Sequence, residues 1–260
     1  MYFVYVLGPA GSGKTSLTST FSEWLKMQKL SVATVNLDPA VEWMPYTPDA
    51  DIRDYIPTYD VMKKFNLGPK GALIASVDLF VDHIYKLRVE VEKQQPNYVL
   101  VDTPGQLEIF AFRPAGRLLI EQLSGDSRSV ALFLIDSYFA TKPSTMASVI
   151  MLALAAAFSH RLPQINVLTK IDMLTPELHG RILQWLEDPE TFISDLSEEK
   201  LPRHYEELVY STPEVFTSVL QDAVAVSSVT WEGMDRLYAA IQRVVAGGED
   251  YLTEEYSEVY

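Results

Sequence analysis

The sequence predicts an α/β fold of three layers, with a mostly parallel central sheet and helices on both of its faces. Two patterns lead to this prediction. Short apolar runs of the kind found in buried parallel strands recur at 2–7, 31–36, 98–101, 129–136, 164–168 and 223–226. Stretches with helical periodicity lie between them, and alternation of strands with helices is typical of a parallel sheet covered by helices.

Length and charge restrict the possible functions. The 260 residues are enough for one large domain (1–248) with a helical insertion near 177–221, followed by an acidic tail at 249–260. The net charge of −14 argues against nucleic acid or an anionic membrane as a direct partner, because both bind basic surfaces. The sequence contains no cysteine, so disulfides and thiolate metal sites are excluded. The first predicted strand starts at Tyr2, and the apolar run 146–158 is too short to span a bilayer, so we expect a cytoplasmic protein.

The segment Gly8–Thr15 reads G-x-x-x-x-G-K-T and lies between a strand and a helix, which is the context that a P-loop requires. Its glycines let backbone N–H groups turn inward around an anion at the helix N-terminus. Lys14 supplies a charge for the β- and γ-phosphates, the Thr15 hydroxyl can bind Mg²⁺, and Ser16 can contact the α-phosphate. The expected phosphate-binding residues are Gly8, Pro9, Ala10, Gly11, Ser12, Gly13, Lys14, Thr15 and Ser16. The fold class is therefore that of the P-loop NTPases.

Two charged residues after the second strand have open interpretations. Asp38 precedes Pro39, which stops the strand, and it lies at the strand edge where α/β sheets bind ligands. It is a candidate for contacting Mg²⁺ through water, for orienting an attacking water, or for capping a turn. Arg53 is either a catalytic cation or an ion-pair partner of Asp51 or Asp54.

A helical seam follows the loop at 66–71. A short helix is expected at 59–65, and then apolar residues recur at steps of four and three, which predicts one long helix. These residues are Leu73, Val77, Phe80, Ile84, Leu87 and Val91. The seam packs either on the sheet or against a helix of a second subunit.

The strand at 98–101 leads directly into D-T-P-G-Q, which is the arrangement of a Walker B strand and a switch loop. Asp102 is expected to hold Mg²⁺ through water, and the Gly105 N–H to sense the γ-phosphate. Gln106 lies next to the expected position of the hydrolytic water. It either orients that water or has no catalytic role.

The strand at 164–168 leads into T-K-I-D, which resembles the base-reading motif of GTPases. The Asp172 carboxylate can accept hydrogen bonds from N1–H and the amino group of guanine together, and adenine offers neither donor there. The Lys170 stem can lie over the base. Thr169 stands where asparagine is commoner, so weaker base binding is expected.

The C-terminal part of the chain contributes less chemistry. Ser227 and Ser228 end the last predicted strand and resemble the weak serine-containing motif whose backbone closes over guanine. A final helix is expected at 231–245, and the acidic tail is either solvated or a docking peptide.

With these motifs in order, N-L-D-P-A at 36–40 and Gly68-Pro69-Lys70 make the chain resemble the GPN-loop GTPases, a dimeric P-loop family of the SIMIBI class. An archaeal member is expected. The resemblance implies a Mg²⁺-dependent, GTP-hydrolysing homodimer that acts on an unidentified protein partner, and eukaryotic members are associated with RNA polymerase assembly. In the family, the Gly-Pro-Asn loop reaches towards the partner's nucleotide. Here Lys70 replaces the asparagine, so it either brings a cation to those phosphates or faces solvent or an acidic neighbour.

The expected catalytic residues are Lys14, Asp38, Lys70, Asp102 and Gln106, and the expected metal-binding residues are Thr15, Asp38 and Asp102. Three other functions remain possible. A nucleotide-gated scaffold would turn over little GTP. A metallochaperone GTPase needs Cys and His ligands, which are missing here. A P-loop kinase would have no use for a guanine-reading aspartate.

Overall fold

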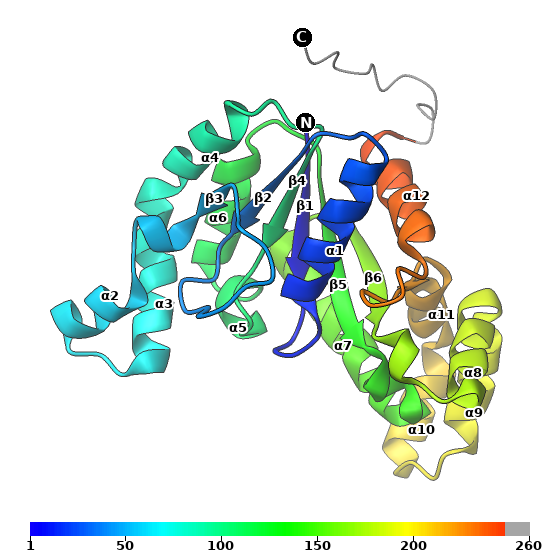
Figure 1. The fold of residues 1–260 in the computed structure, drawn as a ribbon. Coiled ribbons are helices and arrows are strands. Elements are labelled where there is room, and N and C mark those ends of the chain that lie inside the picture. The colour runs from blue at the N-terminus through cyan, green and yellow to red at the C-terminus, as the bar shows by residue number, and fades with distance from the viewer. Residues whose placement is uncertain (248–260) are drawn as a thin grey trace.

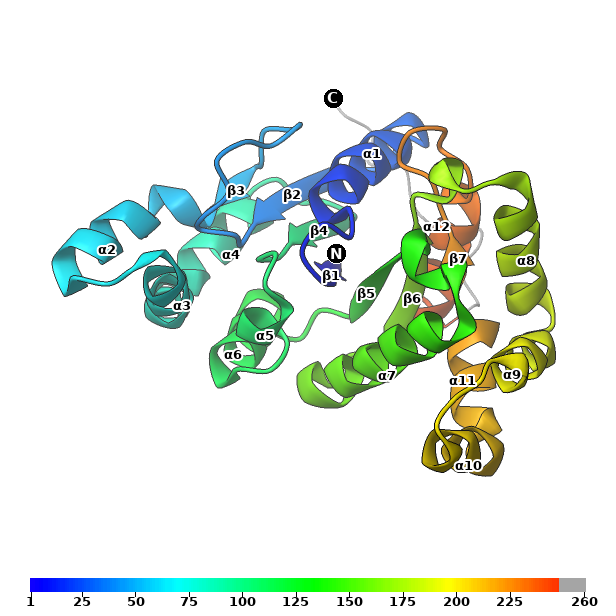
Figure 2. The same cartoon turned by 90° about the horizontal axis from the view of Figure 1, so that it is seen from below.

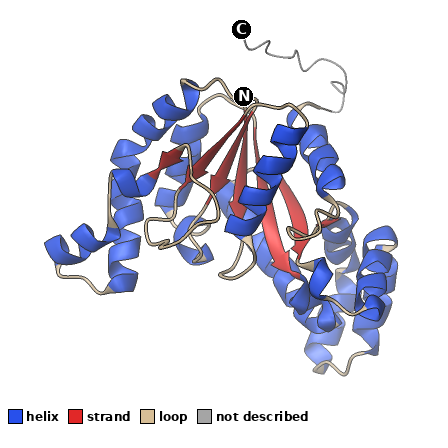
Figure 3. Cartoon of the chain, viewed as in Figure 1, coloured by secondary structure: helices blue, strands red, loops and turns tan. Residues whose placement is uncertain are grey.

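The computed structural model describes residues 1–247, and a seven-stranded sheet forms its centre (Figure 1 and Figure 3). The strands lie in the order β3-β2-β4-β1-β5-β6-β7, and all six neighbouring pairs are parallel. They are β1 Tyr2–Leu7, β2 Val32–Asn36, β3 Ala50–Asp51, β4 Tyr98–Asp102, β5 Ser129–Asp136, β6 Gln164–Thr169 and β7 Val224–Ala225. The expected acidic tail lies outside the described residues.

Helices cover both faces of the sheet. They are α1 Lys14–Met27, α2 Thr58–Phe65, α3 Pro69–Phe80, α4 Ile84–Glu92, α5 Leu107–Phe110, α6 Pro114–Ser124, α7 Pro143–His160, α8 Pro176–Glu187, α9 Pro189–Glu198, α10 Arg203–Ser211, α11 Pro213–Gln221 and α12 Met234–Val245. Seen from below, α1 and α12 lie on one side of the strands and α5, α6 and α7 on the other (Figure 2). The predicted three-layer α/β fold is confirmed.

Strand β1 shows how the sheet is buried between two cores. Phe3, Tyr5 and Leu7 belong to one hydrophobic cluster, and Val4 and Val6 belong to the other. Successive side chains of a strand point to opposite faces, so an uninterrupted apolar run fills both cores at once.

The predicted seam at 73–91 packs on the sheet, because all six of its apolar residues are buried in the core of this chain. The single long helix is wrong in one respect. A 3₁₀ turn at Val81–His83 divides it into α3 and α4.

The expected insertion contains the four helices α8 to α11, which fold around an aromatic cluster. The ring centroid of Phe192 lies 5.1 Å from that of Trp185 and 6.1 Å from that of Phe216. All three side chains belong to the same hydrophobic core as α7, so the insertion extends this core.

Helix α7 is, among the described helices, the one that is long and apolar enough to cross a membrane. This Ala-rich helix is 18 residues long, so it extends beyond the apolar run 146–158 at both ends. A core helix passes the same test of length and composition. Met146, Ile150 and Ala153 are fully buried in this chain, as a helix packed on a sheet requires.

Several elements shift by one residue from the sequence prediction, and three others differ more. Strand β3 was not expected, and β7 has two residues where 223–226 was predicted. Helix α12 begins three residues later than expected, because Gly233 adopts the left-handed conformation (φ 78°) immediately before it.

The parallel sheet brings the sequence motifs together. The P-loop, Asp38, the Asp102–Gln106 segment and the Thr169–Asp172 segment follow β1, β2, β4 and β6, respectively. Since all these strands run in the same direction, the motifs meet at the carboxyl ends of the strands, where α/β proteins bind ligands.

Candidate nucleotide-binding site

The P-loop curls between β1 and α1 as the glycine spacing predicts. Gly8 has φ 146°, and a Cβ atom there would lie 2.8 Å from Leu134 O, so only glycine fits. Gly13 has φ 92° and immediately precedes α1, whose first turn receives no side-chain cap. The N-terminal N–H groups of α1 are therefore available to an anion.

Lys14 lies under this loop and is only 6% exposed. Its Nζ donates to Gly8 O and Pro9 O, each at 2.9 Å. Burial lowers the pKa of Lys14, while the nearby carboxylates of Asp102 and Asp38 act in the opposite direction. The ammonium has three N–H groups, so one donor remains for a phosphate.

Asp102 lies at the end of β4 and is 2% exposed. Burial raises the pKa of its carboxyl to about 6, although the Thr15 hydroxyl, the Lys14 ammonium and Tyr46 each lower it. Oδ2 accepts a hydrogen bond from Tyr46 Oη at 3.2 Å, whereas Oδ1 is buried without any partner within residues 1–247. An unsatisfied buried carboxylate oxygen requires a partner that the polypeptide does not supply.

These donors fit Mg²⁺. The ion prefers oxygen ligands and uses one or two protein groups together with phosphates and water. Asp102 and the Thr15 hydroxyl supply such oxygens beside the P-loop. The described residues contain no cluster of three or more His, Cys, Asp or Glu side chains, so an all-protein metal cage is absent from them.

Asp38 caps a turn, and its two catalytic roles stay predictions. Its Oδ1 accepts from Ala40 N at 2.9 Å, which caps the turn after β2. Its Oδ2 accepts from Gly105 N at 3.3 Å, so the carboxylate also reaches the switch segment after β4. Next to it, Gln106 Oε1 is buried and has no partner among the residues that the structure describes. Both water-orienting candidates thus lie on the same side of the site.

The base-reading segment is bonded to the P-loop. Lys170 Nζ donates to Gly11 O at 2.6 Å and to Asp136 Oδ2 at 2.7 Å. The Thr169 hydroxyl lies 2.8 Å from Ser12 O, to which it donates. The contribution of Thr169 to base binding stays a prediction, and the structure adds that its hydroxyl holds the phosphate-binding loop.

Asp172 and Ser227, which the sequence assigned separately to the base end, contact one another in the structure. The Ser227 hydroxyl donates to Asp172 Oδ1 at 2.6 Å and accepts from Val229 N and Thr230 N at 3.1 and 3.0 Å. The neighbouring Ser228 O accepts from Thr20 Oγ1 of α1 at 3.1 Å. The carboxylate that would select guanine is therefore held by a hydroxyl whose own position is fixed by the backbone.

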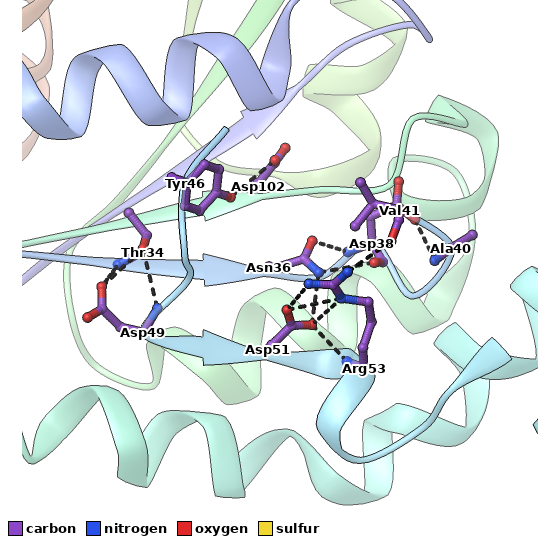
Figure 4. Close-up of polar contacts among 10 residues, drawn as sticks. All are labelled: Thr34, Asn36, Asp38, Ala40, Val41, Tyr46, Asp49, Asp51, Arg53 and Asp102. Carbon is purple, nitrogen blue, oxygen red and sulfur yellow. Dashed lines mark hydrogen bonds and ion pairs between the residues drawn. The ribbon is translucent and has the colours of Figure 1, made fainter. Parts of the chain in front are cut away.

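Arg53 and Lys70 both pair with acids in the chain. The Arg53 guanidinium binds Asp51 through Nε and Nη2, and Nη1 donates to Val41 O at 3.0 Å (Figure 4). The ion-pair interpretation of Arg53 therefore describes the structure. Lys70 Nζ lies 3.5 Å from Glu108 Oε1, and these two side chains are 71% and 61% exposed.

Sequence reasoning gave no role to two polar residues near the site, Asn36 and Tyr46. Asn36 Nδ2 donates to Asp51 Oδ1 at 2.9 Å, and Asp38 N donates to Asn36 Oδ1 at 2.9 Å. Tyr46 reaches Asp102 from the loop between β2 and β3 (Figure 4). Burial and the charge of Asp102 raise the pKa of Tyr46 well above its usual range, so its phenol remains a donor. The strand β3, which holds Asp51, is too short to show a pattern in the sequence.

Known proteins are similar to this chain over most of its length. Residues 6–247 match a family described as "Conserved hypothetical ATP binding protein". GPN-loop GTPase 3 of Danio rerio is 37% identical over 194 residues, which cover 74% of this chain and 68% of that protein. GPN-loop GTPase 1 of Dictyostelium discoideum is 33% identical over 95% of this chain but 62% of its own length, so the chain spans about two thirds of these relatives.

A solved structure has the same fold over almost its whole length. It is a GTPase in apo form from Pyrococcus abyssi, with a TM-score of 0.80 and 30% identity over 93% of this chain and 96% of that one. Relatives thus occur in both eukaryotes and archaea, and an archaeal source for this chain stays a prediction. On its sequence, its fold and the residues at its sheet edge, the chain belongs to the GPN-loop GTPase family.

Proposed function

We propose that the chain is a Mg²⁺-dependent GTPase that works as a homodimeric switch on a protein partner. The bond between the base-reading segment and the P-loop is the observation that carries this proposal. Lys170 Nζ donates to Gly11 O at 2.6 Å, and Asp172, two residues further on, is held by Ser227 at 2.6 Å. A guanine on Asp172 and its phosphates in the P-loop would occupy the two ends of one continuous site.

The phosphate end supplies positive charge where hydrolysis needs it. The P-loop N–H groups and Lys14 bind the β- and γ-phosphates, and Thr15 with Asp102 would hold Mg²⁺. When bound, the ion neutralises charge on the phosphates. These residues then stabilise the charge that develops as the bond to the γ-phosphate breaks.

The attacking water needs an orienting group on the far side of the γ-phosphate. The Asp38 carboxylate accepts from the Gly105 N–H, the expected contact of that phosphate, and Gln106 follows Gly105 in the sequence. Single-turnover rates of Asp38→Asn and Gln106→Leu variants would identify the group that acts. The variant with the larger loss, with unchanged GTP affinity, carries the role.

Calorimetric titration with GTP, GDP and ATP tests the base assignment. Because adenine cannot donate to Asp172, we expect GTP to bind about 100-fold or more tightly than ATP. Equal affinities would contradict the assignment. Single-turnover hydrolysis by the purified protein then separates an enzyme from a nucleotide-gated scaffold, since a scaffold would release no phosphate.

The dimer proposal is supported by the position of the Gly68-Pro69-Lys70 loop. Gly68 and Pro69 form the N-terminus of α3, so Lys70 projects from a fixed helix end. The side chain meets only the exposed Glu108 among the described residues, and together with Gln106 it lines an open cavity of about 710 Å³. A second copy facing this cavity would bring Lys70 towards the partner's nucleotide.

Light scattering and paired substitutions test the dimer and the role of Lys70. Turnover of Lys70→Ala and Lys70→Asn should fall together if the lysine provides a charge in trans, because neither side chain is cationic. Unchanged rates in both variants would remove the catalytic role. The partner is expected to be a cytoplasmic protein, such as an assembly intermediate of RNA polymerase, and capture with GTP-locked and GDP-locked protein would identify it.

A further inference from the structure

Tyr46 is the further residue that the structure singles out. It belongs to the loop 37–49 between β2 and β3, which passes over the end of β4 (Figure 4). Its phenol is half-buried and donates to Asp102 Oδ2 at 3.2 Å. The two residues are 56 positions apart in sequence, so the contact depends entirely on how the loop is folded.

The two oxygens of Asp102 have different surroundings. Oδ2 has the Tyr46 hydroxyl, whereas Oδ1 is buried and has no hydrogen-bond partner within residues 1–247. A carboxylate can rotate about its terminal bond, so either oxygen could in principle turn towards a metal. The bond from Tyr46, together with the contact of this carboxylate with the Thr15 hydroxyl, restrains the rotation. Oδ1 is then the oxygen left without a hydrogen-bond partner among the described residues, and so the one available to Mg²⁺ or its water.

The loop that carries Tyr46 is fixed at both ends. At its start, Leu37 N donates to Asp102 O at 2.8 Å. At its end, Asp49 Oδ2 accepts from Thr34 N and Thr34 Oγ1 at 2.8 and 3.0 Å. Pro45 and Pro48 flank the tyrosine closely and restrict the backbone around it. The phenol therefore reaches Asp102 from a constrained loop rather than from a freely moving one.

We propose that Tyr46 is a positioning residue for the magnesium-binding carboxylate: it holds Oδ2 of Asp102, presents Oδ1 to the metal, and so couples metal binding to docking of the loop 37–49. This inference rests on the proposed Mg²⁺-dependent GTPase function. Carboxylates that bind metals are themselves hydrogen-bonded in this way, and removal of such a partner usually costs 10- to 100-fold in metal affinity.

The decisive variant is Tyr46→Phe, which keeps the ring and removes the hydroxyl. The measurement is the affinity for a fluorescent GDP analogue at increasing Mg²⁺ concentrations, together with the affinity in EDTA. We expect the Mg²⁺ concentration at half-effect to rise about 10-fold or more, while the affinity in EDTA stays at the wild-type value. Tyr59→Phe is the matched control, because Tyr59 is 62% exposed and contacts Lys63 rather than Asp102.

The outcomes separate this inference from the function on which it rests. A wild-type protein that binds no guanine nucleotide, or binds it independently of Mg²⁺, contradicts the proposed function and with it the inference. A wild-type protein with clear Mg²⁺ dependence and a Tyr46→Phe variant that matches it within twofold overturns the inference alone. Circular dichroism of the variant shows that the fold is retained.

Limited chymotrypsin digestion tests the coupling to the loop. Trp43 in the same loop is 76% exposed and is a cleavage site, and phenylalanine at position 46 would remain one too. With saturating Mg²⁺ and GDP, we expect cleavage after Trp43 to be several-fold faster in Tyr46→Phe than in the wild type. Equal cleavage rates would show that the hydroxyl does not hold the loop.

Discussion

The two ends of the nucleotide site differ in how far their charged groups are exposed. At the base end, the Asp172 carboxylate is exposed and accepts a hydrogen bond from the Ser227 hydroxyl. At the phosphate end, Lys14 and Asp102 are buried, and Lys14 and Asp38 are bonded to loop backbone, as in Asp38 to Gly105 N. The base end thus presents an accessible carboxylate, whereas the charges of the phosphate end lie within the protein.

This difference determines which part of the chain must rearrange when a nucleotide binds. Asp172 is exposed and already oriented by Ser227, so a guanine can bind without rearranging the chain. Lys14 and Asp38, by contrast, are bonded to groups of the protein itself. A γ-phosphate would compete with Asp38 for the Gly105 N–H, so we expect the order of the loops that carry these two residues to depend on the ligand.

The largest expected effect comes from Lys14→Ala at the phosphate end. Loss of the ammonium removes the fixed charge on the β- and γ-phosphates, and we expect GTP hydrolysis to fall about 10²- to 10³-fold. The ratio of GTP to ATP affinity should stay at the wild-type value, because the base end does not depend on this side chain. Parallel titrations with both nucleotides check this, and a lost preference for GTP would show that the two ends are not independent.

The next largest effect is expected at the base end from Asp172→Asn. An amide donates where the carboxylate accepts, so it suits the C2 carbonyl of xanthine and rejects the amino group of guanine. We expect GTP affinity to fall about 100-fold and xanthosine triphosphate to become the better ligand. Competition binding with both triphosphates measures the exchange. An unchanged preference for guanine would mean that another residue reads the base.

A smaller effect is expected from Thr169→Val, which removes one hydrogen bond between the two ends and keeps that from Lys170 to Gly11 O. The Ser12 carbonyl then loses a buried donor, which costs about 1–3 kcal/mol in the free energy of unfolding. GTP and GDP affinities should fall by a similar factor, because the P-loop serves both. Urea unfolding and nucleotide titration measure the two consequences, and Thr169→Ser serves as the control that retains the hydroxyl.

The smallest effect is expected from Asp51→Asn beneath the loop 37–49. Burial raises the pKa of Asp51, but the hydrogen bonds from Arg53 and Asn36 outweigh it and leave that pKa below its ordinary value. A lowered pKa in the folded state stabilises the protein at neutral pH, and this stabilisation is lost as the pH falls through it. We expect the variant to be less stable by about 1 kcal/mol at pH 7, with a smaller difference near pH 4. A constant difference in urea unfolding would contradict the charge-based explanation.

The same comparison explains what could be predicted from the sequence. The P-loop, Asp102 and the Asp172–Ser227 pair each follow a buried strand directly, so the strand pattern and the parallel order already place them. Tyr46 contacts Asp102 from a loop whose sequence has no periodicity, and the two residues are 56 positions apart. Local sequence carries no signal for such a contact.

Two further features could not be predicted from the sequence for the same reason. The direction of the Thr169 hydroxyl depends on where the P-loop carbonyls lie, and T-K-I-D alone does not state this. The two residues of β3 show no alternation, and they become a strand only because β2 offers its edge.

The bond from Gly105 N to the Asp38 carboxylate bears on how the protein distinguishes its substrate from its product. The Asp38 carboxylate accepts a hydrogen bond from the same Gly105 N–H that a γ-phosphate would be expected to contact. We therefore expect a triphosphate to displace the Asp38 carboxylate from Gly105 N before it binds fully. A diphosphate, which lacks the γ-phosphate, would leave that hydrogen bond in place. The γ-phosphate would then be detected through displacement of the Asp38 carboxylate. The displaced carboxylate would lie beside the γ-phosphate bond that hydrolysis breaks.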